Sequence, residues 1–297
     1  NKLRSNLPDC SFPIRYTSLT AFNARYRQGR ITATGSLVYT NVTEHVKIGD
    51  APADFQRLAP SFTVSLQPWQ EQLLFLRLMY KSTFRMPTFN DLYYYRLGNR
   101  SLRPEKANEY NMGITWSRSF SSFLNYLSVT VDGYYNDVTD KIVAFPTTYA
   151  WKMANYGKVH VTGMDATLAA AASLGKNMVL VVSGGYTWQK AIDLTDATSK
   201  SYKDQLPYTP KHSGNVSAVL EMPWVNVGYS IVGVSERYSM SQNIPENRID
   251  GYMEHTVSLS RNFSFRHCKL RLQAEIINLT DTQYDVIKYY PDRKSVV

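Results

Sequence analysis

Cysteine and long apolar runs are scarce in this chain of 297 residues. Its two cysteines, Cys10 and Cys268, stand near opposite ends and have neither a C-x-x-C nor a Cys/His ligand spacing. We therefore expect no metal or redox role for them, and their pairing is left open. No stretch reaches the roughly 18 apolar residues that a membrane-spanning helix needs. That lack excludes a helical membrane protein but not a membrane barrel, whose strands need apolar residues on one face only.

Local signatures of catalysis and phosphate binding are also missing. No G-x-S-x-G elbow, H-E-x-x-H pair or Gly-rich loop before a helix is present, so we expect neither an enzyme nor a cofactor. A barrel enzyme is the alternative class, because a Ser or Asp can meet a His across strands without any local signature. Of the five histidines, His160 is expected on a lumen-facing strand face with Lys158 and Thr162.

The net charge of +9 raises the question of a nucleic-acid partner. Lys and Arg are scattered through the whole sequence rather than collected in one tract or on one helix face. We therefore expect a solvated or lumen-facing surface and no nucleic acid.

The chain is rich in tyrosine, with 22 residues, and in segments in which apolar and polar residues alternate with a period of 2. The stretch 73–116 is organised as a strand, a long excursion and a second strand. Leu74, Leu76 and Leu78 share one face of the first strand while Arg77 and Lys81 share the other. The prolines at 87 and 104 keep the backbone extended, so no helix is predicted over 85–108.

The same reading along the whole chain predicts about twelve strands. Long loops at 44–59, 85–108, 191–210 and 239–250 alternate with short turns, which is typical of an up-and-down barrel in an outer membrane. A soluble antiparallel sheet with one wet face gives the same alternation. Strand length favours the barrel, because many candidates reach the roughly 9–11 residues that cross a bilayer. The predicted strands are 17–27, 31–42, 61–67, 73–84, 109–120, 127–145, 156–170, 178–188, 211–222, 225–236, 252–264 and 269–278.

The last of these strands predicts which face meets lipid. Its apolar side chains should point outward, and its polar side chains should face the interior. A Leu272→Arg change near mid-membrane is expected to cost about 2–4 kcal/mol. The outward set is Leu270, Leu272, Ala274 and Ile276, and the inward set is Arg271, Gln273 and Glu275.

Five motifs follow one another in order along more than two hundred residues. The first is F-R-M-P-T-F-N-D-L-Y (84–93) with G-N-R-S-L-R-P-E (98–105), and the second is Y-Y-N-D-V-T-D-K-I (134–142). The others are N-Y-G-K-V (155–159) with G-M-D (163–165), P-Y-T-P-K-H (207–212) and N-L-T-D-T-Q-Y (278–284). Together they resemble the barrel of TonB-dependent outer-membrane receptors.

The resemblance implies an all-β fold, an antiparallel up-and-down transmembrane β-barrel. Residues 1–297 would be one partial barrel domain, the C-terminal portion of about 22 strands, without the plug, the early strands and part of the last strand. It implies a receptor that imports a scarce bulky nutrient, such as a ferric siderophore, haem or cobalamin. Its partners would be a TonB-type energy-coupling protein and the lipid and lipopolysaccharide of a Gram-negative outer membrane. The alternative is a passive channel or a barrel enzyme.

Three predicted loop clusters combine aromatic faces with cationic donors, as a large planar or chelate ligand requires. A binding surface needs at least two of them to converge at the barrel mouth. The alternative is that these aromatics belong to the membrane girdle or pack loop on loop. The clusters are Tyr93, Tyr94, Tyr95 and Arg96; Tyr149, Trp151 and Lys152; and Arg237 and Tyr238.

Overall fold

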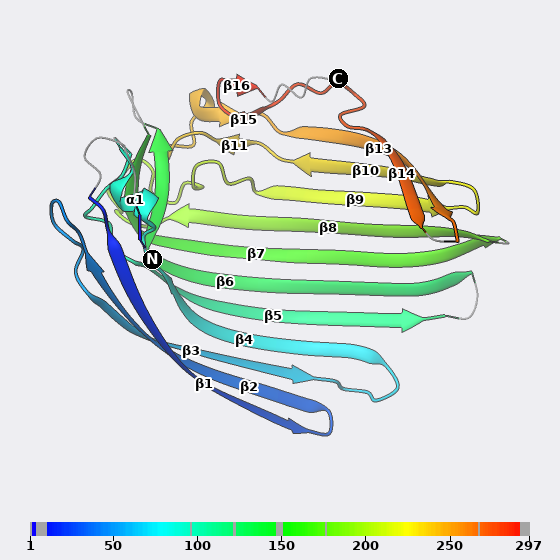
Figure 1. Cartoon of the computed structure of the whole chain (residues 1–297), viewed down its shortest axis with the longest axis horizontal. Helices are drawn as coiled ribbons and strands as arrows, with labels where there is room; N and C mark the ends of the chain where they lie inside the picture. The colour runs from blue at the N-terminus through cyan, green and yellow to red at the C-terminus, as the bar shows by residue number, and fades with distance from the viewer. Residues whose placement is uncertain are drawn as a thin grey trace.

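The chain folds into one antiparallel sheet of twelve strands, in which each strand pairs with the next one along the chain (Figure 1). The computed structural model describes residues 2–3, 11–95, 97–120, 123–146, 151–175, 177–266 and 268–291. The strands are β1 (Ile14–Gln28), β2 (Ile31–His45), β3 (Phe55–Leu66), β4 (Leu73–Arg85), β5 (Glu105–Ser119), β6 (Leu124–Pro146), β7 (Trp151–Gly175), β8 (Met178–Asp193), β9 (His212–Glu221), β10 (Asn226–Val234), β13 (Tyr252–Ser264) and β14 (Lys269–Ile276).

The smaller elements all belong to the longer connections or follow β14. They are helix α1 (Phe89–Tyr93), the 3-10 helix η1 (Pro245–Asn247), the pair β11 (Arg237–Tyr238) and β12 (Arg248–Ile249), and the pair β15 (Asp285–Ile287) and β16 (Tyr290–Pro291). Neither helix in the described ranges has the length and apolarity to cross a membrane.

Long and short connections lie at opposite ends of the sheet, as the sequence predicts. Because every strand is antiparallel to its neighbour in chain order, successive connections must alternate between the two ends. The turns after β1, β3, β7 and β9 lie at the right-hand end in Figure 1, and the loops after β2, β4, β8 and β10 lie at the left-hand end. We call these the turn end and the loop end.

The register divides the sheet into an apolar and a polar face, because directly paired residues point to the same side. The apolar face runs through all twelve strands, and so does the polar face. One residue from each strand on the apolar face is Phe22, Leu37, Phe62, Leu78, Met112, Val131, Leu168, Val182, Val216, Ile231, Leu259 and Leu272. The polar face carries Asn23, Ser36, Thr63, Arg77, Asn111, Asp132, Thr167, Ser183, Ser217, Ser230, Ser260 and Gln273.

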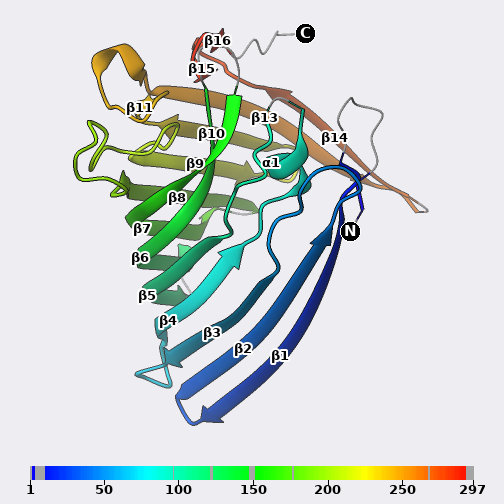
Figure 2. The ribbon, with the colours of Figure 1, turned by 90° about the vertical axis from the view of Figure 1, so that its left-hand side faces the viewer.

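The polar face is the inner, concave one. Figure 2 shows the sheet curving around α1, which lies on its concave side. Leu206 from the loop after β8 packs against Val138 and Val159, which alternate with the apolar-face residues of their strands. The apolar face is therefore convex and has no other part of the described chain covering most of it, and many of its large side chains are exposed.

One sequence prediction about the faces is wrong. His160 pairs with Asp137 and Ile192 and lies on the convex face with Thr162 and Met164, not on the lumen face. The period of 2 along β7 fixes this, because His160 is an even number of residues from Leu168.

Several strands begin earlier than the sequence predicts, and in β3 and β5 the earlier start involves a proline. β3 starts at Phe55 rather than 61, with Pro60 inside it. Pro60 pairs with Leu37 of β2, whereas β3 is paired with β4 only from Ser61 onward. Proline lacks a backbone N–H, so it is tolerated where a strand has a partner on one side only. Similarly, β5 starts at Glu105, directly after a proline.

The excursion after β4 contains a helix that the sequence analysis excluded. Helix α1 begins after Pro87, where Thr88 caps it: the Asp91 backbone N–H donates to Thr88 Oγ1 (3.1 Å), and the Thr88 N–H donates to Asp91 Oδ2 (2.8 Å). This reciprocal capping box nucleates the short helix. Proline stops a helix that reaches it from the N-terminal side but not one that begins after it.

A glycine on the concave face makes room for an ion pair that spans three strands. Arg77 Nη2 lies 3.1 Å from Asp132 Oδ1, and Gly113 stands between them in the register. A Cβ at position 113 would lie 2.1 Å from Asp132 Oδ1.

We expect Gly113→Val to destabilise the barrel by about 1–3 kcal/mol, the usual cost of overpacking. Gly133→Val is the matched control, because a Cβ there has only the Met112 carbonyl oxygen within 4.0 Å. Urea-dependent unfolding in lipid vesicles measures both. Equal stability of the two variants would contradict the role of Gly113.

Candidate functional site

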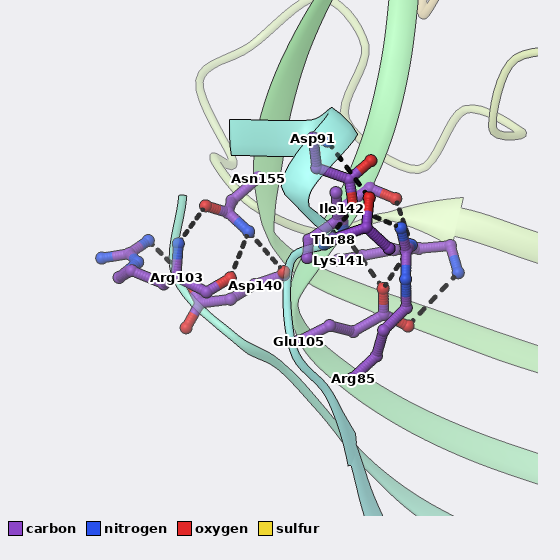
Figure 3. Close-up of polar contacts among 9 residues, drawn as sticks. All are labelled: Arg85, Thr88, Asp91, Arg103, Glu105, Asp140, Lys141, Ile142 and Asn155. Atoms are coloured by element: carbon purple, nitrogen blue, oxygen red, sulfur yellow. Dashed lines mark hydrogen bonds and ion pairs between the residues drawn. The ribbon is translucent and has the colours of Figure 1, made fainter. Parts of the chain in front are cut away.

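The long loop between β4 and β5 is anchored by a cluster of charged side chains from the first sequence motif (Figure 3). Arg85 Nη2 lies 2.9 Å from Asp91 Oδ2, and its Nη1 lies 3.8 Å from Glu105 Oε2. Glu105 also accepts the Ile142 backbone N–H (3.0 Å), and its second oxygen lies 3.7 Å from Lys141 Nζ. The cluster thus ties both ends of the loop to β6.

A second set of contacts holds the same loop to β7. The Asn155 side-chain amide donates to the carbonyl oxygens of Arg103 (3.0 Å) and Asp140 (2.6 Å) and accepts the Arg103 N–H (2.9 Å). Arg103 Nη2 pairs with Asp140 Oδ1 at 2.5 Å. Asp140 itself has a positive φ of 55°, a conformation that Asp tolerates better than most residues. The motif residues are therefore organisers of the loop end.

Tyr93, the first residue of the first predicted cluster, packs inside the loop end. Its hydroxyl donates to Glu44, a nearly buried carboxylate that also pairs with Arg15 Nε at 2.6 Å. Burial raises the pKa of the Tyr93 phenol well above its usual range, and the hydrogen bond to Glu44 raises it further. The Arg100 guanidinium lies 5.6 Å from the ring centre. Tyr93 is thus a neutral packing residue.

Its neighbours face solvent. Tyr94 is 52% exposed and Tyr95 is 41% exposed, so both rings are available to a large ligand. Arg96 lies outside the described residues, as does Tyr149 of the second cluster.

One residue of each of the other two clusters, Trp151 and Arg237, lines a pocket at the loop end, which we call the rim pocket, whereas Lys152 and Tyr238 do not line it. It has a volume of about 390 Å³. The Trp151 ring centre lies 6.2 Å from that of Tyr208, and Trp151 is 37% exposed. Burial raises the pKa of Tyr208 above its ordinary value. The lining residues are Trp151, Tyr208, Pro210, Val234, Arg237, Tyr252, Val286 and Ile287.

Arg237 supplies the cationic group of the rim pocket and is only 5% exposed. Its Nη2 donates to the carbonyl oxygens of Asp285 (2.5 Å) and Val286 (3.3 Å), and its guanidinium lies 5.8 Å from the Tyr252 ring centre. Its Nη1 is buried and has no hydrogen-bond partner among the described residues. A buried charged donor without an acceptor is costly, so this group favours an anionic ligand.

The placement differs from the sequence prediction in several respects. Trp151 and Lys152 do not lie on a loop but open β7, because the strand extends five residues beyond the predicted start and pairs with the end of β6. Tyr238 lies beside the rim pocket and accepts the Tyr208 N–H at 2.7 Å through its carbonyl oxygen. Tyr94 and Tyr95 do not line the pocket.

The sequence analysis missed two aromatic residues of the rim pocket, Tyr208 and Tyr252. Tyr208 lies in the P-Y-T-P-K-H motif, which carried part of the family resemblance but gave no signal for a binding surface. Tyr252 stacks on Tyr284 with ring centres 3.8 Å apart. Within the part of the chain that the structure describes, no three His, Cys, Asp or Glu side chains group as a metal site.

Comparisons with known proteins point to a single family. The family model described as "TonB dependent receptor-like, beta-barrel" matches residues 8–279. The vitamin B12 transporter BtuB of Photobacterium profundum is 25% identical over 209 residues, which are 68% of this chain and 30% of that protein. BtuB of Vibrio vulnificus is 32% identical over 84 residues, 28% of this chain and 13% of that protein.

Solved structures share the fold at low identity. The unliganded ferric citrate transporter FecA superposes with a TM-score of 0.71 at 15% identity, covering 91% of this chain and 41% of its own. The ferric-catecholate import receptor Fiu of E. coli K12 gives 0.66 at 17% identity, covering 93% and 42%. The chain thus spans less than half the length of these relatives and structures.

Proposed function

Because this chain belongs to the TonB-dependent receptor-like β-barrel family, we propose that it forms part of an outer-membrane receptor that imports a scarce, bulky nutrient. The receptor lies in the outer membrane of a Gram-negative bacterium, among lipid and lipopolysaccharide. It draws energy from a TonB-type protein. The nutrient is a ferric siderophore, haem or cobalamin, and the protein acts as a transporter rather than an enzyme.

The rim pocket is the observation that carries this proposal. It joins residues of two predicted clusters, Trp151 and Arg237, with the rings of Tyr208 and Tyr252. Aromatic faces stack on planar ligands, and a buried guanidinium with one unpartnered nitrogen binds anionic groups of a chelate. The exposed rings of Tyr94 and Tyr95 extend the binding surface at the loop end.

A first prediction follows for uptake by cells that carry the receptor. Cyanocobalamin, ferric citrate and haemin are tested as probes, and the wild type is expected to take up one of them. Trp151→Ala should lower the uptake of that probe by about tenfold, the effect of losing one good aromatic stack. Trp69→Ala is the matched control, since Trp69 is an exposed tryptophan in a turn-end connection. It should leave uptake unchanged.

The joint substitution of Tyr94, Trp151 and Tyr238 by Ala should abolish that uptake while the barrel stays folded. Unchanged uptake in the triple variant would rule out this binding site. Loss in Trp69→Ala to the same extent would point to a general folding defect instead.

A further inference from the structure

Two asparagine side chains at the loop end make the same kind of contact, in which one amide pairs with both backbone groups of a residue in a neighbouring loop. Asn155 does so with Arg103. Asn243, in the loop after β10, accepts the Gln205 backbone N–H through Oδ1 (2.8 Å) and donates from Nδ2 to the Gln205 carbonyl oxygen (3.0 Å). The Asn243 backbone N–H also donates to Asp204 Oδ2 (3.0 Å). These three hydrogen bonds, which we call the loop clasp, join the loop after β10 to the loop after β8.

The backbone of Gln205 needs these partners because of how it lies against β8. Gln205 forms an isolated antiparallel bridge with Ile192, and flanking residues make the hydrogen bonds of that bridge. One of them is the bond from the Leu206 N–H to the Ala191 carbonyl oxygen (2.8 Å). In such a pair the N–H and C=O of the central residue point away from the partner strand. Because Gln205 is only 3% exposed, these two groups would be costly without Asn243.

Tyr208 lies in the turn 206–210 that follows Gln205. The Gln205 side chain donates from Nε2 to the Thr209 carbonyl oxygen (3.3 Å), and the Tyr208 N–H donates to the Tyr238 carbonyl oxygen (2.7 Å) in the loop after β10. Tyr208 has a φ of 55°, a costly conformation for a bulky residue that persists only where its surroundings fix it. The turn is therefore held from the side of β8 and from the loop after β10.

The rim pocket spans the same two loops. Tyr208 and Pro210 line it from the loop after β8, and Arg237 lines it from the loop after β10. Arg237 has anchors of its own, the carbonyl oxygens of Asp285 and Val286. The ring of Tyr208 has its place in the pocket only while the two loops stay together. The residues of the loop clasp do not line the pocket.

We propose that Asn243 is a positioning residue for ligand binding. By holding the loops after β8 and β10 together, it sets the Tyr208 ring against Trp151 in the rim pocket without touching the ligand. The inference rests on the proposed function of that pocket. Once the loop clasp opens, the binding-competent arrangement is only partly populated, and the apparent affinity falls by the populated fraction.

Hydrogen exchange of the purified receptor tests the positioning without any ligand. Asn243→Ala should speed exchange of the Tyr208 amide by about tenfold, the effect of losing hydrogen bonds to a buried residue. The Leu206 amide, which donates to β8, should stay protected. Asn155→Ala is the matched control, because it loses the same kind of contact in another loop. It should speed exchange of the Arg103 amide and leave the Tyr208 amide as in the wild type.

A double-mutant cycle separates positioning from general stability. The probe is whichever of cyanocobalamin, ferric citrate and haemin the wild type binds. Asn243→Ala and Tyr208→Ala should each weaken its binding by about tenfold. The double variant should bind no more weakly than Tyr208→Ala, because a clasp that acts through Tyr208 has nothing left to position. When Asn155→Ala is combined with Tyr208→Ala, the two single effects should multiply.

If the effects of Asn243→Ala and Tyr208→Ala multiply, the proposal is overturned. An unchanged Tyr208 amide in Asn243→Ala would overturn it as well, and so would equal acceleration of that amide in Asn155→Ala. A wild type that binds none of the three probes contradicts the proposed transport instead. Exchange of the Tyr208 amide then decides alone whether Asn243 positions this ring.

Discussion

Leu168→Arg is expected to reduce the free energy of unfolding by about 2–4 kcal/mol, the depth-dependent cost of an arginine on the lipid face of a barrel. Leu168 is 41% exposed on the convex face and pairs with Val129 and Gly184. It lies in the middle of the convex apolar positions of β7, which run from Met164 to Ala172. No acidic side chain faces it across either neighbouring strand.

Thr167→Arg provides the matched control. Thr167 is the preceding residue on the same strand but points to the concave face, where it pairs with Thr130 and Gly185. An arginine there stays in water, so the cost should be less than about 1 kcal/mol. Unfolding by urea in lipid vesicles gives both values. If Thr167→Arg proves the more damaging change, the assignment of the two faces is reversed.

Leu168 is a sharper probe of the lipid face than Leu272, the position that the sequence suggested. Among the described strands, β14 pairs only with β13, and Leu272 faces Arg261 across that pair. An arginine at 272 would therefore stand at a sheet edge beside an existing cation, where neighbouring charge and depth both contribute to the result.

Much of this fold follows from periodicity alone. The alternation in β4, β8 and β14 predicts the two faces, and the alternation of short and long connections predicts the meander. Both succeed because period 2 and antiparallel pairing are local consequences of an extended chain. The motifs at 84–105 and 134–142 could indicate the family because each of them is a local, contiguous stretch of sequence.

What the sequence could not give depends on pairing between distant segments. From the sequence alone, Pro60 is expected to break a strand. The register shows that it is tolerated because β3 has β2 as its partner at this position and pairs with β4 only from Ser61 onward. The rim pocket joins Trp151, Tyr208 and Arg237 from three separate segments, and no spacing rule connects them. The contact between Asn243 and Gln205 likewise joins residues that lie 38 positions apart in the sequence.

The sequence analysis missed helix α1 for a different reason. The capping box Thr88-x-x-Asp91 is a local signal, but the sequence analysis did not use it and excluded a helix from the prolines at 87 and 104. Its consequence reaches beyond five residues, because Leu92 and Leu102 of the loop pack on Ile142 and Met153. The second large effect is therefore expected at this helix.

Asp91→Ala is expected to cost about 1–3 kcal/mol in local stability of the loop 86–104. Removing the carboxylate leaves the Thr88 N–H without an acceptor, which accounts for this cost, whereas the cap that Thr88 Oγ1 provides for the Asp91 backbone N–H remains. The ion pair with Arg85 adds little, because that arginine is 46% exposed. Hydrogen exchange of the Leu92 and Asn99 amides, which donate to Thr88 and Asp91 carbonyls, reports the opening.

Asp91→Asn separates the two interactions. Asparagine keeps an acceptor oxygen for the Thr88 N–H and loses only the charge that faces Arg85, so its amides should exchange within about tenfold of the wild type. Equal acceleration in both variants would mean that the ion pair, not the cap, holds the helix. No acceleration in either would mean that the apolar contacts of Leu92 and Leu102 suffice. We expect amide exchange to be far faster in Asp91→Ala than in Asp91→Asn. Ligand uptake should then fall in Asp91→Ala alone, because Tyr94 and Tyr95 directly follow the helix.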